Sequence, residues 1–186
     1  YILFGLVIVT GYVRPIRLGE IMLELQEKGA HNIDLVTPTH YADVIAGVLE
    51  KIRPQLEIPV VYNCGGYEKV ETLKMLDGLI DIYLPDFKYA SPDLAGEYSS
   101  APDYPDTAAK AIAEMYRQTG NVRFDEDGLM KKGVLVRHLV LPGCRHDSMK
   151  VLDILKATVP VGDIRISLMR QYTPCGKALE IKNLSR

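Results

Sequence analysis

The sequence lacks an apolar run long enough to cross a membrane. Its longest run, residues 2–9, is broken by Gly5 and is far shorter than the roughly 20 residues that a membrane-spanning helix needs. No positively charged region precedes the run and no small-residue cleavage site follows it, so a secretory signal is not supported. We therefore expect a strand at residues 2–9, no membrane partner and a cytoplasmic location.

The sequence is also poor in cysteine and has no excess of charge of one sign. Three cysteines, an odd number at wide spacing, do not make a disulfide framework, which favours a reducing compartment. The formal net charge is -2, and the basic and acidic residues are interspersed. No basic face is available for nucleic acid, so we expect no nucleic-acid partner.

Low-complexity stretches and flexible linkers are absent as well. With 186 residues and 47% hydrophobic content, the chain can bury a full core, and residues 1–186 are predicted to form a single domain.

Short β-rich runs alternate with segments of helical spacing along the whole chain. The runs are apolar on both faces, which is typical of strands covered from two sides. Helical spacing of apolar residues lies between them. The predicted strands are residues 2–9, 32–36, 58–62, 80–84, 134–141 and 164–168, and the predicted helices centre on residues 18–25, 44–52, 70–76, 108–116 and 151–155.

Strict strand and helix alternation predicts an α/β fold with parallel strands joined by right-handed crossovers. About five or six such units can curl towards a barrel, whereas a complete one needs about 250 residues. The expected fold is a partial (β/α) barrel, incomplete at both ends. One insertion lies between Pro85 and Val134, where Asp127 and Gly128 predict a hairpin turn.

Polar residues follow the predicted strands, where parallel α/β folds place their chemistry. His40 follows one strand, Asn63 and Gly65 the next, and Asp86 and Lys88 a third. Each has a simpler interpretation: a tight turn at Asn63, an ion pair between Asp86 and Lys88, and a capping or solvated His40. Their convergence on one rim, with glycines beside them, favours a site for a polar, charged small molecule.

Three segments together resemble a known family. Residues 61–68 (VYNCGGYE), 81–88 (DIYLPDFK) and 136–143 (VRHLVLPG) resemble successive strand ends of radical S-adenosylmethionine (SAM) proteins related to pyruvate formate-lyase activating enzyme, and residues 31–41 and 167–174 fit the same activating-enzyme-like subgroup. The similarity spans residues 19–174. It implies a partial (β/α)6 barrel of the radical SAM type that binds SAM across its rim.

The resemblance also implies roles for particular residues. Asn63 would contact SAM, Asp86 and Lys88 would hold its ribose and methionyl carboxylate, and Arg137 would point into the barrel towards the same ligand. Such charge-assisted bonds suit a sheltered cleft. His40 and Gly65 complete the residues expected to bind this cofactor.

One feature of that family is missing from the sequence. The family binds a [4Fe-4S] cluster through a Cys-x3-Cys-x2-Cys loop, and the sequence contains no such loop. We therefore expect a fragment, or a product missing its amino-terminal part, with the cluster present in the intact family member only. Cys64, Cys144 and Cys175 all follow strands and could together bind iron or zinc, but free cysteines are more often small buried apolar residues, so no metal site is predicted.

The intact protein is expected to cleave SAM to a 5'-deoxyadenosyl radical that abstracts hydrogen from a protein substrate, an oxidoreductase or lyase type of chemistry. This chain alone is expected to be inactive, and no catalytic residue is assigned. An alternative is a SAM-binding or partner-docking module without a cluster. A further alternative, from a different class, is an aldolase that forms a Schiff base on Lys88.

Overall fold

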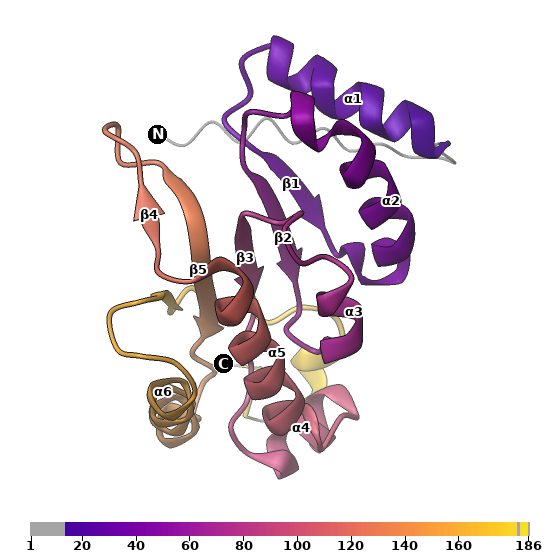
Figure 1. Ribbon diagram of the computed structural model, residues 1–186. Coiled ribbons are helices and arrows are strands. Elements are labelled where there is room, and N and C mark those ends of the chain that lie inside the picture. Colours follow the sequence, from indigo (N-terminus) through magenta and orange to yellow (C-terminus); the bar gives the residue numbers. More distant parts are fainter. Residues whose placement is uncertain (1–13, 182, 186) are drawn as a thin grey trace.

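The computed structural model describes residues 14–181 and 183–185, so the strand predicted at residues 2–9 lies outside the described residues. Helices and strands alternate along the chain (Figure 1). The helices are α1 (Pro15–Glu27), α2 (Ala42–Ile52), α3 (Val70–Lys74), α4 (Pro92–Ser99), α5 (Tyr104–Thr119) and α6 (Arg145–Thr158), with short 3-10 turns η1 (Pro38–Tyr41), η2 (Arg53–Gln55) and η3 (Gly176–Glu180). The strands are β1 (Ile33–Val36), β2 (Val60–Cys64), β3 (Ile82–Pro85), β4 (Arg123–Phe124), β5 (Met130–Leu139) and β6 (Arg165–Met169).

Among the described residues, the strands form one six-stranded sheet in the order β1-β2-β3-β5-β4, with β6 also paired to β5. The pairs β1 with β2, β2 with β3, β3 with β5 and β5 with β6 are parallel, and only β4 with β5 is antiparallel. The prediction of an α/β fold with parallel strands is therefore confirmed. The antiparallel pair is the hairpin expected at Asp127 and Gly128, and Gly128 has a left-handed φ of 77° in its turn.

The sheet of the described residues is open, which is compatible with the predicted incomplete architecture but does not confirm a barrel. In the part of the chain that the structure covers, β1 pairs with β2 alone and β6 with β5 alone. The strands β3 and β5 also separate beyond Tyr83 and Val134, since Pro85 has no backbone N–H to continue the ladder. The two strands meet again at a single bridge between Asp86 and Arg137.

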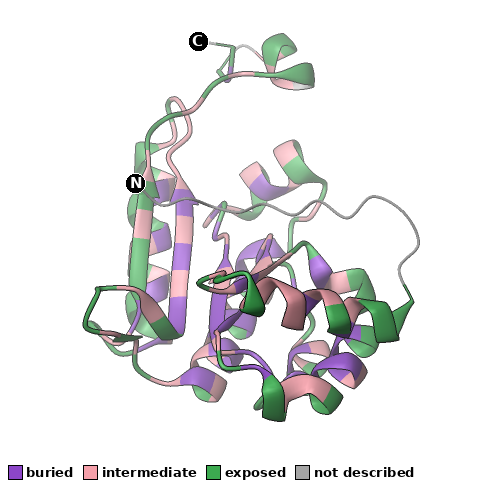
Figure 2. Cartoon of the chain, turned by 90° about the horizontal axis from the view of Figure 1, so that it is seen from above, coloured by how far each residue is buried: buried purple, intermediate pink, exposed green. Residues whose placement is uncertain are grey.

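The core lies between one face of the sheet and the helices. Tyr62, Tyr83 and Val134 are register partners on neighbouring strands, so their side chains form one row, and all three are fully buried. Helix α5 contacts both β3 and β5 on this side, and it lies in front of the strands in Figure 1. In Figure 2 the buried residues gather on the central strands and on the helix sides that face them, whereas β4 and β6 contain no buried residue.

The strands were predicted to be covered from two sides, but the opposite face of the sheet is partly exposed. Side chains alternate along a strand, so Asn63 points away from the row that contains Tyr62. Its register partners Val36 and Leu84 share that face, and Val36 is 55% exposed. The described residues thus leave this face partly open, and Asp34, Asn63 and Arg137 lie on it.

None of the helices in the described ranges is both long enough and apolar enough to span a membrane.

Candidate ligand-binding site

A connected set of charged and amide side chains lies on the open face of the sheet. Arg137, on β5, is at its centre: Nε donates to Asp86 Oδ1 at 2.9 Å, and Nη2 donates to Asn63 Oδ1 at 2.8 Å. Asn63 Nδ2 in turn donates to Asp34 Oδ2 at 3.3 Å, and Lys88 Nζ lies 3.9 Å from Asp86 Oδ2. We call Asp34, Asn63, Asp86, Lys88 and Arg137 the polar array.

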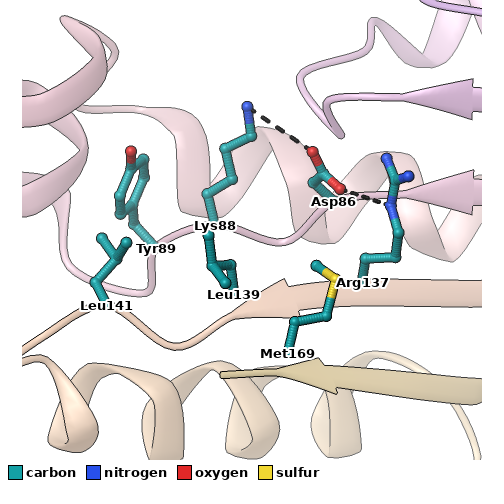
Figure 3. A pocket seen from close by; sticks show the side chains of 7 residues that line it. All are labelled: Asp86, Lys88, Tyr89, Arg137, Leu139, Leu141 and Met169. Carbon is teal, nitrogen blue, oxygen red and sulfur yellow. Dashed lines mark hydrogen bonds and ion pairs between the residues drawn. The ribbon is translucent and has the colours of Figure 1, made fainter. Parts of the chain in front are cut away.

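Four of these five side chains were predicted to share one site, and the structure brings them together. Asn63 lies within β2, Asp86 and Lys88 directly after β3, and Arg137 within β5. Figure 3 shows Asp86 between the Lys88 ammonium and the Arg137 guanidinium. The ion pair expected from the period-two spacing of Asp86 and Lys88 is also present, at 3.9 Å.

The loop after β3 is held by contacts with residues far away in the sequence. Asp86 N donates to Cys64 O at 3.0 Å, and Phe87 N donates to Arg137 O at 2.8 Å. Phe87 O lies 2.6 Å from His138 Nδ1, and the ring of that buried histidine also contacts Ser148 Oγ at 2.8 Å through Nε2. His138 therefore supports the loop from the core side and does not reach the open face.

Helix α6 holds the far end of the same loop. The Asp147 carboxylate accepts from Ala90 N at 3.0 Å and from Ser91 N at 2.7 Å. A side chain on a loop can bind a ligand well only if its backbone is held in place. Asp86 and Lys88 meet that condition, since both ends of their loop are fixed.

The hollow beside the polar array is small and has two kinds of lining. Its polar side is Asp86, Lys88 and Arg137, and its cavity volume is about 190 Å³. Ligand pockets usually measure about 300–1,000 Å³, so a nucleoside would place only part of itself here and extend over the open face. The apolar side is made by Tyr89, Leu139, Leu141 and Met169 (Figure 3).

The charges of the polar array are balanced when every member is ionised, with two carboxylates opposite two cations. Burial raises the pKa of the Asp34 carboxyl, an effect opposed by the hydrogen bond from Asn63 and the charge of Arg137. Its Oδ1 is buried and has no hydrogen-bond partner among the described residues. A balanced set of this kind suits a ligand that itself carries both signs of charge.

Gly65 and Gly66 follow Asn63 and lie against the loop after β3. A Cβ on Gly65 would lie 3.7 Å from Lys88 Nζ, so the ammonium passes directly over this glycine. Gly66 has a φ of 81°, and a Cβ there would lie 2.0 Å from Asp86 O. The close approach of the two loops therefore requires glycine at position 66.

His40 lies apart from the polar array. It is exposed in η1, as a solvated histidine would be. Its neighbour Thr39 donates through Oγ1 to Glu68 Oε1 at 2.7 Å, and Tyr62 OH donates to Glu68 Oε2 at 3.2 Å. Burial raises the pKa of Glu68, which is only 3% exposed.

The cysteines of the described residues do not form a metal site. Cys64 is buried, Cys144 is half-buried and Cys175 is exposed. Burial raises the pKa of the Cys64 thiol, which disfavours the thiolate that an iron–sulfur cluster needs. Residues 14–181 and 183–185 contain no group of three His, Cys, Asp or Glu side chains that could hold a metal ion. They therefore do not fit a [4Fe-4S] cluster.

Sequence reasoning missed Asp34, Tyr104 and Asp147. Asp34 carried a signal, since it is a carboxylate inside an apolar strand. Tyr104 and Asp147 carried none, because their contacts with the site span 16 to 57 residues of sequence and follow no local period.

The fold and the site together define an open α/β protein with a connected polar array near the carboxyl ends of its parallel strands. No protein-family model matches the chain. A curated relative, the uncharacterized protein MJ0674 of Methanocaldococcus jannaschii, is 29% identical over 132 residues, which cover 69% of this chain and 34% of that protein. The chain thus spans about a third of the length of this relative.

Among solved structures, the chain is similar to a domain of pyruvate-formate lyase-activating enzyme from Bacteroides vulgatus. The TM-score is 0.42 at 11% identity, over 75% of this chain and 98% of that one. A likeness at this level does not establish a shared fold.

Proposed function

We propose that this chain is the SAM-binding part of a radical SAM protein related to pyruvate formate-lyase activating enzyme. The observation that carries the proposal is the polar array, in which Asn63, Asp86, Lys88 and Arg137 meet on one open sheet face. The sequence resemblance assigns SAM binding to these four residues. The chain would act as a truncated radical SAM barrel of one domain, residues 1–186, within a longer protein.

Each side chain of the array has a physical role in this proposal. The Asp86 carboxylate accepts hydrogen bonds from the two ribose hydroxyls, because each carboxylate oxygen can accept two. The Lys88 ammonium and the remaining N–H groups of Arg137 bind the methionyl carboxylate. Asn63, which Arg137 and Asp34 orient, contacts the same ligand, and Gly65 leaves room for it. Exposed His40 would join only from the rim.

The proposal for this chain stops at SAM binding, because the described residues include no ligand set for the cluster. Radical formation, hydrogen abstraction from a protein substrate and a cytoplasmic location are proposed for the intact protein alone. A brown, oxygen-sensitive product of the complete reading frame would support this. A colourless product that still binds SAM would instead support the alternative of a binding or docking module without a cluster.

The Schiff-base alternative is not favoured by the surroundings of Lys88. A nucleophilic lysine is usually desolvated in an apolar pocket or placed beside another cation. The Lys88 side chain is 46% exposed and pairs with a carboxylate.

Titration calorimetry with SAM and with 5'-methylthioadenosine, which lacks the carboxylate, tests the proposed roles. Lys88→Met should weaken SAM binding roughly 10- to 100-fold, the loss expected for one charge-assisted bond, and leave 5'-methylthioadenosine nearly unaffected. Asp86→Asn should weaken both ligands, because both carry the ribose. Lys131→Met is the matched control, since Lys131 pairs with Asp125 at 3.0 Å in the hairpin, away from the array.

The two ligands also give the outcomes that would contradict the proposal. Absence of SAM binding by the unsubstituted chain at millimolar ligand would refute it. Equal loss of both ligands in Lys88→Met would refute the carboxylate role of Lys88.

A further inference from the structure

We propose that the Tyr104 hydroxyl is a positioning group of the ligand site, which fixes Lys88 relative to Gly65. Tyr104 is the first residue of α5, and it belongs to neither of the loops that carry the site. The effect on SAM rests on the proposed function, whereas the effect on the two loops does not.

The hydroxyl joins the loop after β2 to the loop after β3. It lies 2.9 Å from Gly65 O and 3.0 Å from Asp86 O, and it accepts from Lys88 N at 3.0 Å. A phenol has one proton to donate and lone pairs to accept with. Tyr104 therefore donates to the two carbonyls in turn or shares its proton between them, while it satisfies the Lys88 amide throughout.

The loops after β2 and β3 approach each other closely beside the Tyr104 hydroxyl. A Cβ on Gly66 would lie 2.0 Å from Asp86 O and 3.0 Å from the Tyr104 hydroxyl oxygen. The backbones are in contact at this point, and the phenol oxygen fills the remaining space beside them. Its loss would leave the partly buried Lys88 N–H without a partner, which costs free energy.

The ring of Tyr104 is fixed independently of the hydroxyl. Tyr104 is 3% exposed, and its ring centroid lies 5.9 Å from that of Tyr67, 6.3 Å from Phe87 and 5.8 Å from Tyr89. Aromatic pairs at these separations stabilise the core beyond the area they bury. Tyr104→Phe would keep this packing and remove only the oxygen.

The position of the Lys88 backbone sets the range within which its ammonium can lie. Lys88 Nζ passes over Gly65 and lies 3.9 Å from Asp86 Oδ2. Both neighbours belong to the backbones that Tyr104 joins. Release of the Lys88 amide would therefore let the ammonium move away from Gly65 and from the place where it would bind the methionyl carboxylate of SAM.

Two measurements on Tyr104→Phe test the proposal, with Tyr83→Phe as the control. Tyr83 is equally buried, and its hydroxyl donates to Gln118 at 2.5 Å on the helix side of the sheet. Hydrogen exchange of the Lys88 amide should be at least about tenfold faster in Tyr104→Phe and within about twofold of wild type in Tyr83→Phe. The dissociation constant for SAM should rise roughly three- to tenfold in Tyr104→Phe alone.

A double-mutant cycle separates positioning from general destabilisation. In a Lys88→Met background, Tyr104→Phe should change SAM affinity by less than about twofold, because the group that it positions is gone. An undiminished loss in that background, or unchanged exchange of the Lys88 amide in Tyr104→Phe, would overturn the proposal. If wild-type chain does not bind SAM, the proposed function fails, and the exchange result alone decides whether Tyr104 holds the loops.

Discussion

Glu68 is a carboxyl group buried between the loops that follow β1 and β2. Thr39 and Tyr62 donate to it, a hydrogen bond from the Cys64 thiol lowers its pKa, and His40 lies near enough to act on its charge. Burial is the largest influence and raises the pKa of Glu68, while the hydrogen bonds and His40 lower it. The protonated form of this side chain is therefore more favoured in the folded chain than in the unfolded chain.

The raised pKa of Glu68 predicts a pH dependence of stability with a definite sign. Between the ordinary pKa of glutamate and the raised value, the folded chain binds more protons than the unfolded chain, so stability falls as pH rises through that interval. Glu68→Gln should flatten this dependence and remain within about 1 kcal/mol of wild type at the acidic end, because the amide oxygen can accept from one hydroxyl while the NH2 group donates to the other. Urea unfolding at a series of pH values measures it.

Glu50→Gln is the control, since Glu50 is an exposed glutamate on α2. It should leave the pH dependence unchanged. A Glu68→Gln profile parallel to that of wild type would show that Glu68 does not titrate in this interval.

Helix α6 contributes to the site through the first turn of the helix. Asp147 accepts from the backbone N–H groups of Ala90 and Ser91, and Ser148 contacts the His138 ring that supports Phe87 O. The helix lies at the lower left of Figure 1, well separated in sequence from the loop that it holds. The loop that carries Asp86 and Lys88 is thus fixed by an element that contributes no side chain to the polar array.

Asp147→Ala should destabilise the chain by about 2 kcal/mol, because it leaves two partly buried N–H groups without partners. The free energy of urea unfolding measures the loss. Asp153→Ala, an exposed position on the same helix, should change it by less than about 0.5 kcal/mol. Equal effects of the two substitutions would mean that the loop does not depend on Asp147.

The same elements show what the sequence could predict. Apolar spacing predicted α1, α2, α3, α5 and α6, and β-rich runs predicted β1, β2, β3, β5 and β6. The bounds agree within about four residues, except that α6 begins six residues before its predicted segment. Asn63, Asp86, Lys88 and Arg137 were found because polar residues stand out at the ends of apolar strands. Tyr104 was not found, because its ring is part of the core and only its oxygen serves the loops.

Whether the strands curl into a barrel could not be predicted, because the curvature depends on which strand edges find partners. Local spacing shows that a run is apolar, but it does not show whether a face is covered. Asp34 lies inside a run that was interpreted as apolar on both faces, yet it forms part of the open face. The polarity of that face is also why the array has a common surface on which a ligand could bind.

The polar array links four neighbouring strands of the sheet, so a ligand bound to it should stabilise the folded chain. Its side chains come from β1, β2, the loop after β3, and β5. A ligand at 100 times its dissociation constant adds about 2.7 kcal/mol if it binds only the folded chain. For a chain of this size, SAM at that concentration should raise Tm by roughly 5–10 °C.

The array must be intact for that rise in Tm to occur. Asp86→Asn should abolish most of the shift, whereas Asp77→Asn, which removes a surface ion pair with Arg117, should keep it in full. Differential scanning calorimetry with and without SAM compares the three chains. A shift of equal size in Asp86→Asn would place the ligand elsewhere on the molecule, because binding energy lost at the array must appear as lost stabilisation of the folded state.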